Sequence, residues 1–257
     1  MSEPILATEG LRRSFGTLVA VDGVSLYIRA GSITGLIGPN GAGKSTLFNL
    51  LTGALRPDAG SVWLMGRDIT GVPPDRLFAL GLGRTFQIPR PFARMSVLEN
   101  VMLAPTGQVG EGLAGPFLLR GRMARQERRI REKALEVLEF VTLAPLADHP
   151  AGKISGGQRK LLELARVLMG EPKVILLDEP AAGVNPVLTE TLIEKIEALN
   201  RAGTTFVIIE HDMHFVMRHC DPVIALAEGR VVFEGSAEAA RTDPLLLDAY
   251  LGATLDV

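Results

Sequence analysis

The stretch Gly38-Pro39-Asn40-Gly41-Ala42-Gly43-Lys44-Ser45 matches the phosphate-binding loop pattern GxxxxGK[ST]. Residues 32–37 before it have the pattern of a short buried strand, and residues 44–52 have that of a helix. Glycines in such a loop let backbone N–H groups turn toward phosphate oxygens at the positive end of the helix. Lys44 would then reach the β- and γ-phosphates, and Ser45 would ligate Mg²⁺. The loop therefore predicts that the chain binds a nucleoside triphosphate.

Two adjacent acids follow a second apolar run. Residues 174–177 are all aliphatic, as expected of a central strand that is buried on both faces. Asp178 and Glu179 come at its carboxyl end, where open α/β sheets bind their ligands. We expect Asp178 to hold Mg²⁺ through water and Glu179 to accept the proton of an attacking water molecule.

Strand and helix patterns alternate along most of the chain. The expected strands are residues 5–12, 24–28, 32–37, 61–64, 173–177, 204–209 and 222–226, with a terminal pair around 230–234. The expected helices are residues 44–52, 123–141, 158–169, 186–200 and 213–219. Between about residues 88 and 166 the pattern is helical with no convincing strand, and it contains a stretch punctuated by Gly and Pro at residues 105–116. These patterns predict an α/β fold with a mostly parallel sheet, covered on both sides, and an inserted helical segment.

Composition excludes several other classes of protein. The 257 residues include 27 Lys and Arg against 29 Asp and Glu, so the basic field typical of a nucleic-acid-binding protein is absent. A single cysteine, Cys220, excludes an intrachain disulfide and a cysteine metal cage, and is expected to be a small buried apolar residue. No apolar run approaches the roughly 20 residues that span a bilayer, and the first residues lack the pattern of a signal peptide. We expect a cytoplasmic protein.

One segment departs from this balance of charge. Residues 120–133 contain seven basic residues and only two acids, Glu127 and Glu132, which gives a local charge of +5. A solvated helix face explains the pattern, and so does contact with anionic lipid or with the cytoplasmic side of a membrane partner. Both interpretations stay open on the sequence alone.

A second glycine-rich helix start lies at Ile154-Ser155-Gly156-Gly157-Gln158. Ser155 is expected to cap the helix, while the glycines expose backbone N–H groups that suit another phosphate contact. An ordinary capped turn would have the same sequence. The motif indicates a phosphate contact only in combination with the phosphate-binding loop and the Asp178–Glu179 pair.

Together the three motifs resemble the ABC ATPase family over essentially the whole chain. The resemblance makes Ser155, Gly156, Gly157 and Gln158 the signature motif, which contacts the ATP of a partner subunit. It makes Glu179, His211 and Gln87 the catalytic residues, and Ser45, Gln87 and Asp178 the Mg²⁺ ligands. The nucleotide-binding residues that it implies are Phe15, whose ring would stack on adenine, and Gly38, Pro39, Asn40, Gly41, Ala42, Gly43, Lys44, Ser45 and Thr46.

The same resemblance implies an architecture and a set of partners. Residues 1–257 would form one ABC ATPase domain with an antiparallel β subdomain, and residues 88–166 the inserted helical subdomain. Two such domains face each other head to tail, so a homodimer or a heterodimer with a related ATPase is implied. Two membrane permease subunits and, indirectly, a periplasmic substrate-binding protein would complete a transporter at the cytoplasmic face of the cell membrane.

A closer resemblance is to the ATPase subunits of branched-chain amino-acid importers. It rests on five stretches, which are Arg84-Thr85-Phe86-Gln87, Met95-Ser96-Val97-Leu98-Glu99-Asn100, Asp178-Glu179-Pro180 followed by Ala181-Ala182-Gly183-Val184-Asn185-Pro186, Glu210-His211-Asp212-Met213 and Ala249-Tyr250-Leu251-Gly252. Most ABC ATPases have Asp where this chain has Asn185, and Asn also occurs in the branched-chain subfamily.

Other roles for an ABC ATPase remain as alternatives. Urea or short-amide importers and the lipopolysaccharide-export ATPase are similar. A soluble ABC protein of translation or DNA repair usually has two ATPase domains or long coiled coils, and this chain has neither. A module that senses nucleotide without hydrolysing it would be expected to lack Glu179 or His211, and both are present.

Overall fold

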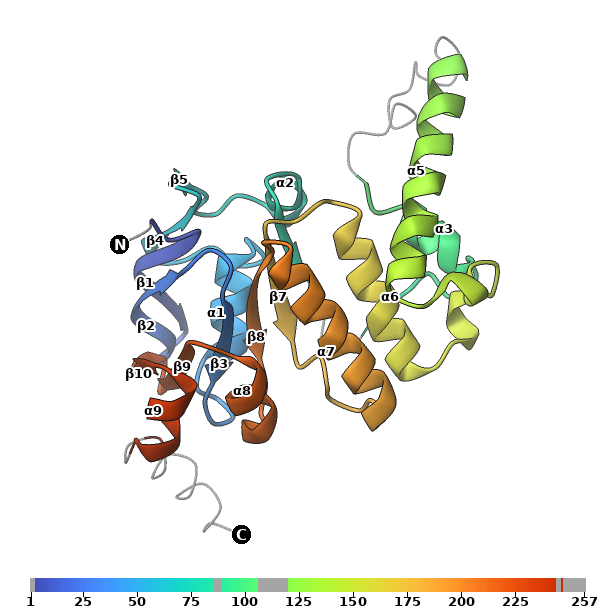
Figure 1. Cartoon of the computed structure of the whole chain (residues 1–257). Helices are drawn as coiled ribbons and strands as arrows, with labels where there is room; N and C mark the ends of the chain where they lie inside the picture. The colour runs from blue at the N-terminus through green and yellow to red at the C-terminus, as the bar shows by residue number, and fades with distance from the viewer. Residues whose placement is uncertain (1–2, 86–88, 106–119, 244–245, 247–257) are drawn as a thin grey trace. The chain divides into compact units, whose positions relative to one another are not determined.

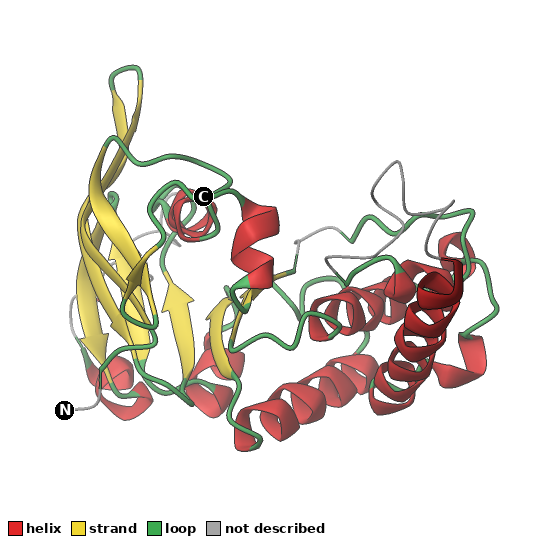
Figure 2. Ribbon diagram, turned by 90° about the horizontal axis from the view of Figure 1, so that it is seen from above, coloured by secondary structure: helices red, strands yellow, loops and turns green. Residues whose placement is uncertain are grey.

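The computed structural model describes residues 3–85, 89–105, 120–243 and 246. The chain divides into two compact units. The first consists of Met1–Arg84, Lys173–Pro180 and Ala198–Val257, and the second of Thr85–Pro172 and Ala181–Glu197. The strands named below, yellow in Figure 2, belong to the first unit, while the second is built from helices and loops.

A six-stranded sheet organises the first unit. Its strands are β3 (Ile33–Ile37), β6 (Leu82–Arg84), β7 (Val174–Asp178), β8 (Thr205–Ile209), β9 (Val223–Ala227) and β10 (Arg230–Gly235). They lie in the order β10-β9-β3-β8-β7-β6, and each neighbouring pair is parallel except β10 with β9. Every residue of β7 and β8 is buried, which explains their continuous apolar sequences. The predicted, mostly parallel sheet is confirmed.

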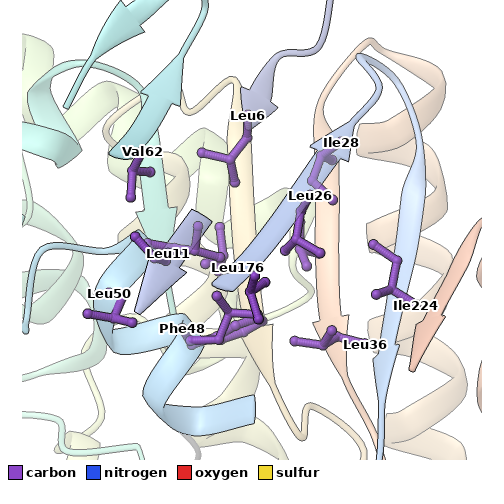
Figure 3. Packing of buried hydrophobic residues seen from close by; sticks show 14 of the residues in the cluster. Leu6, Leu11, Leu26, Ile28, Leu36, Phe48, Leu50, Val62, Leu176 and Ile224 are labelled. Carbon is purple, nitrogen blue, oxygen red and sulfur yellow. The ribbon is translucent and has the colours of Figure 1, made fainter. Parts of the chain in front are cut away.

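The second sheet of this unit is antiparallel. It orders β2 (Leu18–Ile28), β1 (Leu6–Phe15), β4 (Ala59–Leu64) and β5 (Arg67–Asp68) side by side. Buried and exposed residues alternate along the second half of β2, as expected of a sheet with one covered face. Both sheets share a core with helix α1 (Lys44–Leu51). Figure 3 shows Leu11 of β1, Phe48 of α1 and Leu176 of β7 close together in this core.

The remaining helices are divided between the two units. The first unit also contains α2 (Pro74–Ala79), α8 (Met213–His219) and α9 (Ala237–Thr242). The second contains α3 (Val97–Met102), α5 (Arg120–Phe140), η2 (Ala144–Leu146), η3 (Ala151–Lys153) and α6 (Gly156–Leu168), and α7 (Pro186–Arg201) begins in it. Helix α5 lies against α3 and α6 (Figure 1) and buries Ala134 and Leu138, which lie one turn apart on the same face. Among the described residues, no helix is both long and apolar enough to cross a membrane.

Several elements differ from the sequence expectations. Strand β2 begins at Leu18, six residues before the expected start, because Val19 and Val21 continue its alternation after the turn at Gly16. Strands β5 and β6 and helices α2 and α9 were not expected, since two to six residues are too few to display a periodicity. The helical segment expected over residues 88–166 lies within the second unit, and residues 106–119 of it are outside the described residues.

Candidate nucleotide site

The phosphate-binding loop connects β3 to α1, in the strand–loop–helix order that the sequence predicts. Gly38 and Gly43 have φ angles of 150° and 98°, which favour glycine. A Cβ atom at Gly38 would lie 2.3 Å from the carbonyl oxygen of Leu226, and one at Gly43 would lie 2.2 Å from that of Ala20. The loop therefore needs glycine at both positions, for backbone conformation and for space.

Lys44 is held inside this loop. Its ammonium group donates hydrogen bonds to the carbonyl oxygens of Gly38, at 2.7 Å, and Pro39, at 2.9 Å. Burial lowers the pKa of Lys44, while the nearby carboxylates of Glu179 and Asp178 act in the opposite direction. The loop thus places a buried amine within the electrostatic reach of both predicted acids. Ser45, one residue further, is exposed in the first turn of α1.

Asp178 ends strand β7 and is buried against Arg84, the last residue of the neighbouring strand β6. The Arg84 guanidinium donates to Asp178 Oδ2 at 3.2 Å, to Asn49 Oδ1 at 2.6 Å and to Thr52 Oγ1 at 3.2 Å. Arg84 therefore ties the predicted metal-binding acid to helix α1. Sequence reasoning assigned no role to Arg84, because β6 is too short to be recognised and Asp178 is 94 positions away.

Glu179 and His211 meet at the carboxyl ends of two adjacent parallel strands. Asp178 pairs with Ile209 where β7 runs beside β8, and the N–H of Glu179 donates to the carbonyl oxygen of Ile209 at 2.9 Å. His211 Nε2 lies 2.7 Å from Glu179 Oε1. Glu179 has a φ of 48°, an uncommon left-handed conformation that occurs preferentially at functional sites. The fold thus brings together two of the three residues, Glu179 and His211, that the family resemblance implies to be catalytic.

Phe15 ends β1 and its ring is partly exposed, with the Arg13 guanidinium 5.1 Å from the ring centre. Strand β2, its hairpin partner, passes the phosphate loop at Ala20, whose carbonyl oxygen faces Gly43. An exposed aromatic ring on this hairpin fits the predicted contact with a base. Gln87, the other residue that the family resemblance implied, is outside the described residues.

The glycine-rich motif of the second unit begins helix α6 with a capping box. Ser155 Oγ accepts from the N–H of Gln158 at 3.2 Å, and Gln158 Oε1 accepts from the N–H of Ser155 at 2.8 Å. The predicted cap at Ser155 is confirmed. Gly156 has open space around its Cα, whereas a Cβ atom at Gly157 would lie 2.6 Å from Leu188 Cδ1. The first glycine exposes backbone and the second allows close packing.

Comparisons with known proteins agree with this arrangement. The family model described as ABC transporter matches residues 21–182. The chain is 43% identical to the probable branched-chain amino acid transport ATP-binding protein LivG of Archaeoglobus fulgidus, over 97% of this chain and 96% of the relative. The chain belongs to the ABC transporter family. The family predicted from the three motifs is confirmed, and so are its α/β fold and its ATPase class.

Two further comparisons cover the length of this ABC cassette. The high-affinity branched-chain amino acid transport ATP-binding protein LivG of Salmonella typhimurium is 40% identical over 98% of this chain and 99% of the relative. A crystal structure of an ABC transporter ATP-binding cassette in its ADP conformation has a TM-score of 0.83 at 39% identity. It covers 98% of this chain and 100% of that one. The fold of the cassette is therefore that of a protein seen with ADP.

Asn185, the residue that departs from the commoner Asp of ABC ATPases, caps helix α7. Its Oδ1 accepts from the N–H of Leu188 at 2.9 Å, and Pro186 follows at the first helical position. An amide oxygen serves this contact as well as a carboxylate oxygen would. Asn-Pro before an amphipathic run is a sequence signal for such a cap.

We expect Asn185→Ala to lower the free energy of unfolding by about 1 kcal/mol, because an N–H of α7 loses its acceptor. Urea denaturation of the full chain followed by circular dichroism measures the change. Asn185→Asp is the matched control and should retain native stability, since its carboxylate can accept the same hydrogen bond. Equal losses in both variants would contradict the capping role.

Cys220 is buried at the end of α8, as expected of a small apolar residue. Burial raises the pKa of its thiol to about 12, and Glu210 adds to this effect. The neutral thiol therefore stabilises the fold fully below pH 9, the ordinary thiol value, and this contribution is lost as the pH rises from 9 toward 12. We expect slow alkylation by iodoacetamide at pH 8 in the native chain and fast alkylation in denaturant. Equal rates would show that the thiol is accessible in the fold.

Proposed function

We propose that this chain is the ATP-hydrolysing subunit of a membrane importer for branched-chain amino acids. The observation that carries the catalytic part is the Glu179–His211 pair at the carboxyl ends of β7 and β8. The cargo is supported by the names of full-length relatives at about 40% identity.

Different residues of the first unit bind the phosphates, activate the attacking water and contact the adenine ring of ATP. Loop N–H groups and Lys44 bind the phosphates, in exchange for the carbonyl contacts that Lys44 makes in this structure. Glu179 accepts the proton of a water molecule that attacks the γ-phosphate, and His211 holds the Glu179 carboxylate and contacts the same phosphate. Phe15 stacks on the adenine ring.

The donor set of this site fits Mg²⁺. Asp178 supplies a buried carboxylate and Ser45 an exposed hydroxyl, and oxygen atoms of this kind are the ligands that Mg²⁺ prefers. Arg84 engages one oxygen of Asp178, Oδ2, so the carboxylate is already oriented. When bound, the ion would neutralise charge on the transferred phosphate. Gln87 is proposed as a further ligand.

Hydrolysis requires a second ATPase subunit. The Ser155–Gln158 capping box leaves the backbone around Gly156 open, and this surface is proposed to bind the γ-phosphate of ATP held by the partner. The partner is a second copy or a related ATPase. We place the dimer at the cytoplasmic face of the cell membrane, bound to two permease subunits and served by a periplasmic binding protein.

The test is affinity purification of the tagged chain from its native membranes in mild detergent, with identification of co-purifying proteins by mass spectrometry. We expect two permeases and a second ATPase, with untagged membranes as the control. Recovery of soluble proteins alone would overturn the importer, and recovery of outer-membrane lipid-transport proteins would overturn its cargo. In the reconstituted complex with its binding protein, leucine should stimulate ATP turnover and urea should not. Stimulation by urea instead would reassign the cargo.

A further inference from the structure

Helix α5 carries a basic surface that the nucleotide chemistry does not use. Five exposed arginines form it, and they are Arg122, Arg125, Arg128, Arg129 and Arg131. At 3.6 residues per turn they cover about half of the helix circumference over about 14 Å of its length. We call these five side chains the α5 arginine surface. The first turns of α5 extend beyond the ends of α3 and α6 (Figure 1).

Ion pairs to the described part of the chain do not neutralise this surface. Among the described residues, none of the five arginines forms an ion pair, although Glu127 and Glu132 lie on the same helix. Lys133, the next basic residue, pairs instead with Glu171. Arg125 Nε donates to the carbonyl oxygen of Gly121, a neutral acceptor, and no carboxylate of the described residues pairs with its guanidinium group.

The order of charges along α5 also opposes helix stability. The helix dipole favours acids in the first turn and bases in the last, and α5 has neither. Four of the five arginines lie in its amino-terminal half, whereas the exposed acids Glu136 and Glu139 lie in its carboxyl-terminal half. Charges placed for the stability of the helix would run in the reverse order. The arginines are therefore explained by something outside the helix.

We propose that the α5 arginine surface binds the anionic phosphate headgroups of the membrane lipid surface. Arginine guanidinium groups bind phosphate oxygens through two parallel hydrogen bonds. The five arginines cover about half of the helix circumference. A single carboxylate could engage only one of them, whereas a plane of many headgroups could engage several at once. Ala134 and Leu138, on the apolar face of α5, are buried, so that part of the helix is not available for insertion and the arginines would make the contact with the headgroups.

The inference rests on the proposed function only in that a membrane lies beside the protein. The test uses the full chain alone, sedimented with vesicles of phosphatidylcholine or of phosphatidylcholine containing about one third phosphatidylglycerol. We expect binding to the anionic vesicles alone and its loss at high salt. Arg122→Gln/Arg125→Gln/Arg129→Gln should weaken this binding by about 100-fold, at roughly five-fold for each arginine.

Two controls separate this surface from general charge and from misfolding. Arg67→Gln/Arg76→Gln/Arg218→Gln removes the same charge from exposed positions of the first unit and should bind vesicles like the native chain. The three Arg→Lys changes on α5 should retain most of the binding. The melting temperature of the α5 Gln variant should stay unchanged or rise, because its charges no longer oppose the dipole.

Three outcomes would overturn the proposal. One is a native chain that ignores anionic vesicles, and another is equal loss of binding in the α5 and control variants. The third is an α5 Gln variant that binds vesicles normally but no longer co-purifies permeases, which would assign the surface to an acidic protein segment. Each of these leaves ATP hydrolysis and the importer untouched. Conversely, vesicle binding would stand even if no permease co-purified.

Discussion

Glu179→Gln is expected to lower steady-state ATP turnover by about 10²- to 10⁴-fold, while ATP binding is retained. The glutamine amide has nearly the shape of the carboxylate and can still contact His211, which lies 2.7 Å from Oε1 in the native chain. It cannot take a proton from water at neutral pH. Phosphate release measures turnover, and equilibrium binding of a fluorescent ATP analogue measures affinity.

Glu228→Gln provides a matched control for this experiment. Glu228 has the same φ of 48° as Glu179, and its side chain is exposed after strand β9. Because the two changes are chemically identical and occur in the same backbone conformation, the control accounts for the effect of a Glu→Gln change at such a backbone position. Normal turnover in the Glu179 variant, or equal loss in both variants, would show that another group activates the water.

The parts of the site that local sequence determines could be predicted. The phosphate loop depends on Gly38 and Gly43, whose conformations and neighbours leave no room for a side chain, so its pattern is visible in eight consecutive residues. Strand β7 is buried along its whole length, and its apolar run therefore ends visibly at Asp178. Ser155 and Asn185 cap helices through residues three positions away, which is also a local signal.

The parts that depend on distant pairing could not be predicted in the same way. The sequence suggested that Glu179 and His211 act together only through family resemblance, since their contact requires β7 to lie beside β8. Arg84 is the clearest example of a residue whose position the sequence does not predict. It follows no periodic pattern, and its position beside Asp178 arises from the pairing of a three-residue strand with β7. Propensity in so short a segment is outweighed by tertiary packing.

Replacement of Arg84 is expected to destabilise the fold strongly, because it removes the contact with Asp178. The Arg84 and Asp178 side chains are 14% and 9% exposed, so the carboxylate lies in surroundings where an unpaired charge is costly. Arg84→Met keeps much of the side-chain volume but removes the cation, and Asn49 and Thr52 lose a donor as well. We expect the free energy of unfolding of the nucleotide-free chain to fall by about 3–5 kcal/mol.

Urea denaturation of the full chain measures this loss, and two companion variants identify its cause. Arg76→Met, at an exposed position of α2, should change stability by no more than about 0.5 kcal/mol. Arg84→Met/Asp178→Asn removes the carboxylate charge together with its partner and should recover a large part of the loss. If the double variant were as unstable as Arg84→Met, the buried charge of Asp178 would not be the cause. The role of Arg84 would then lie in its hydrogen bonds to α1.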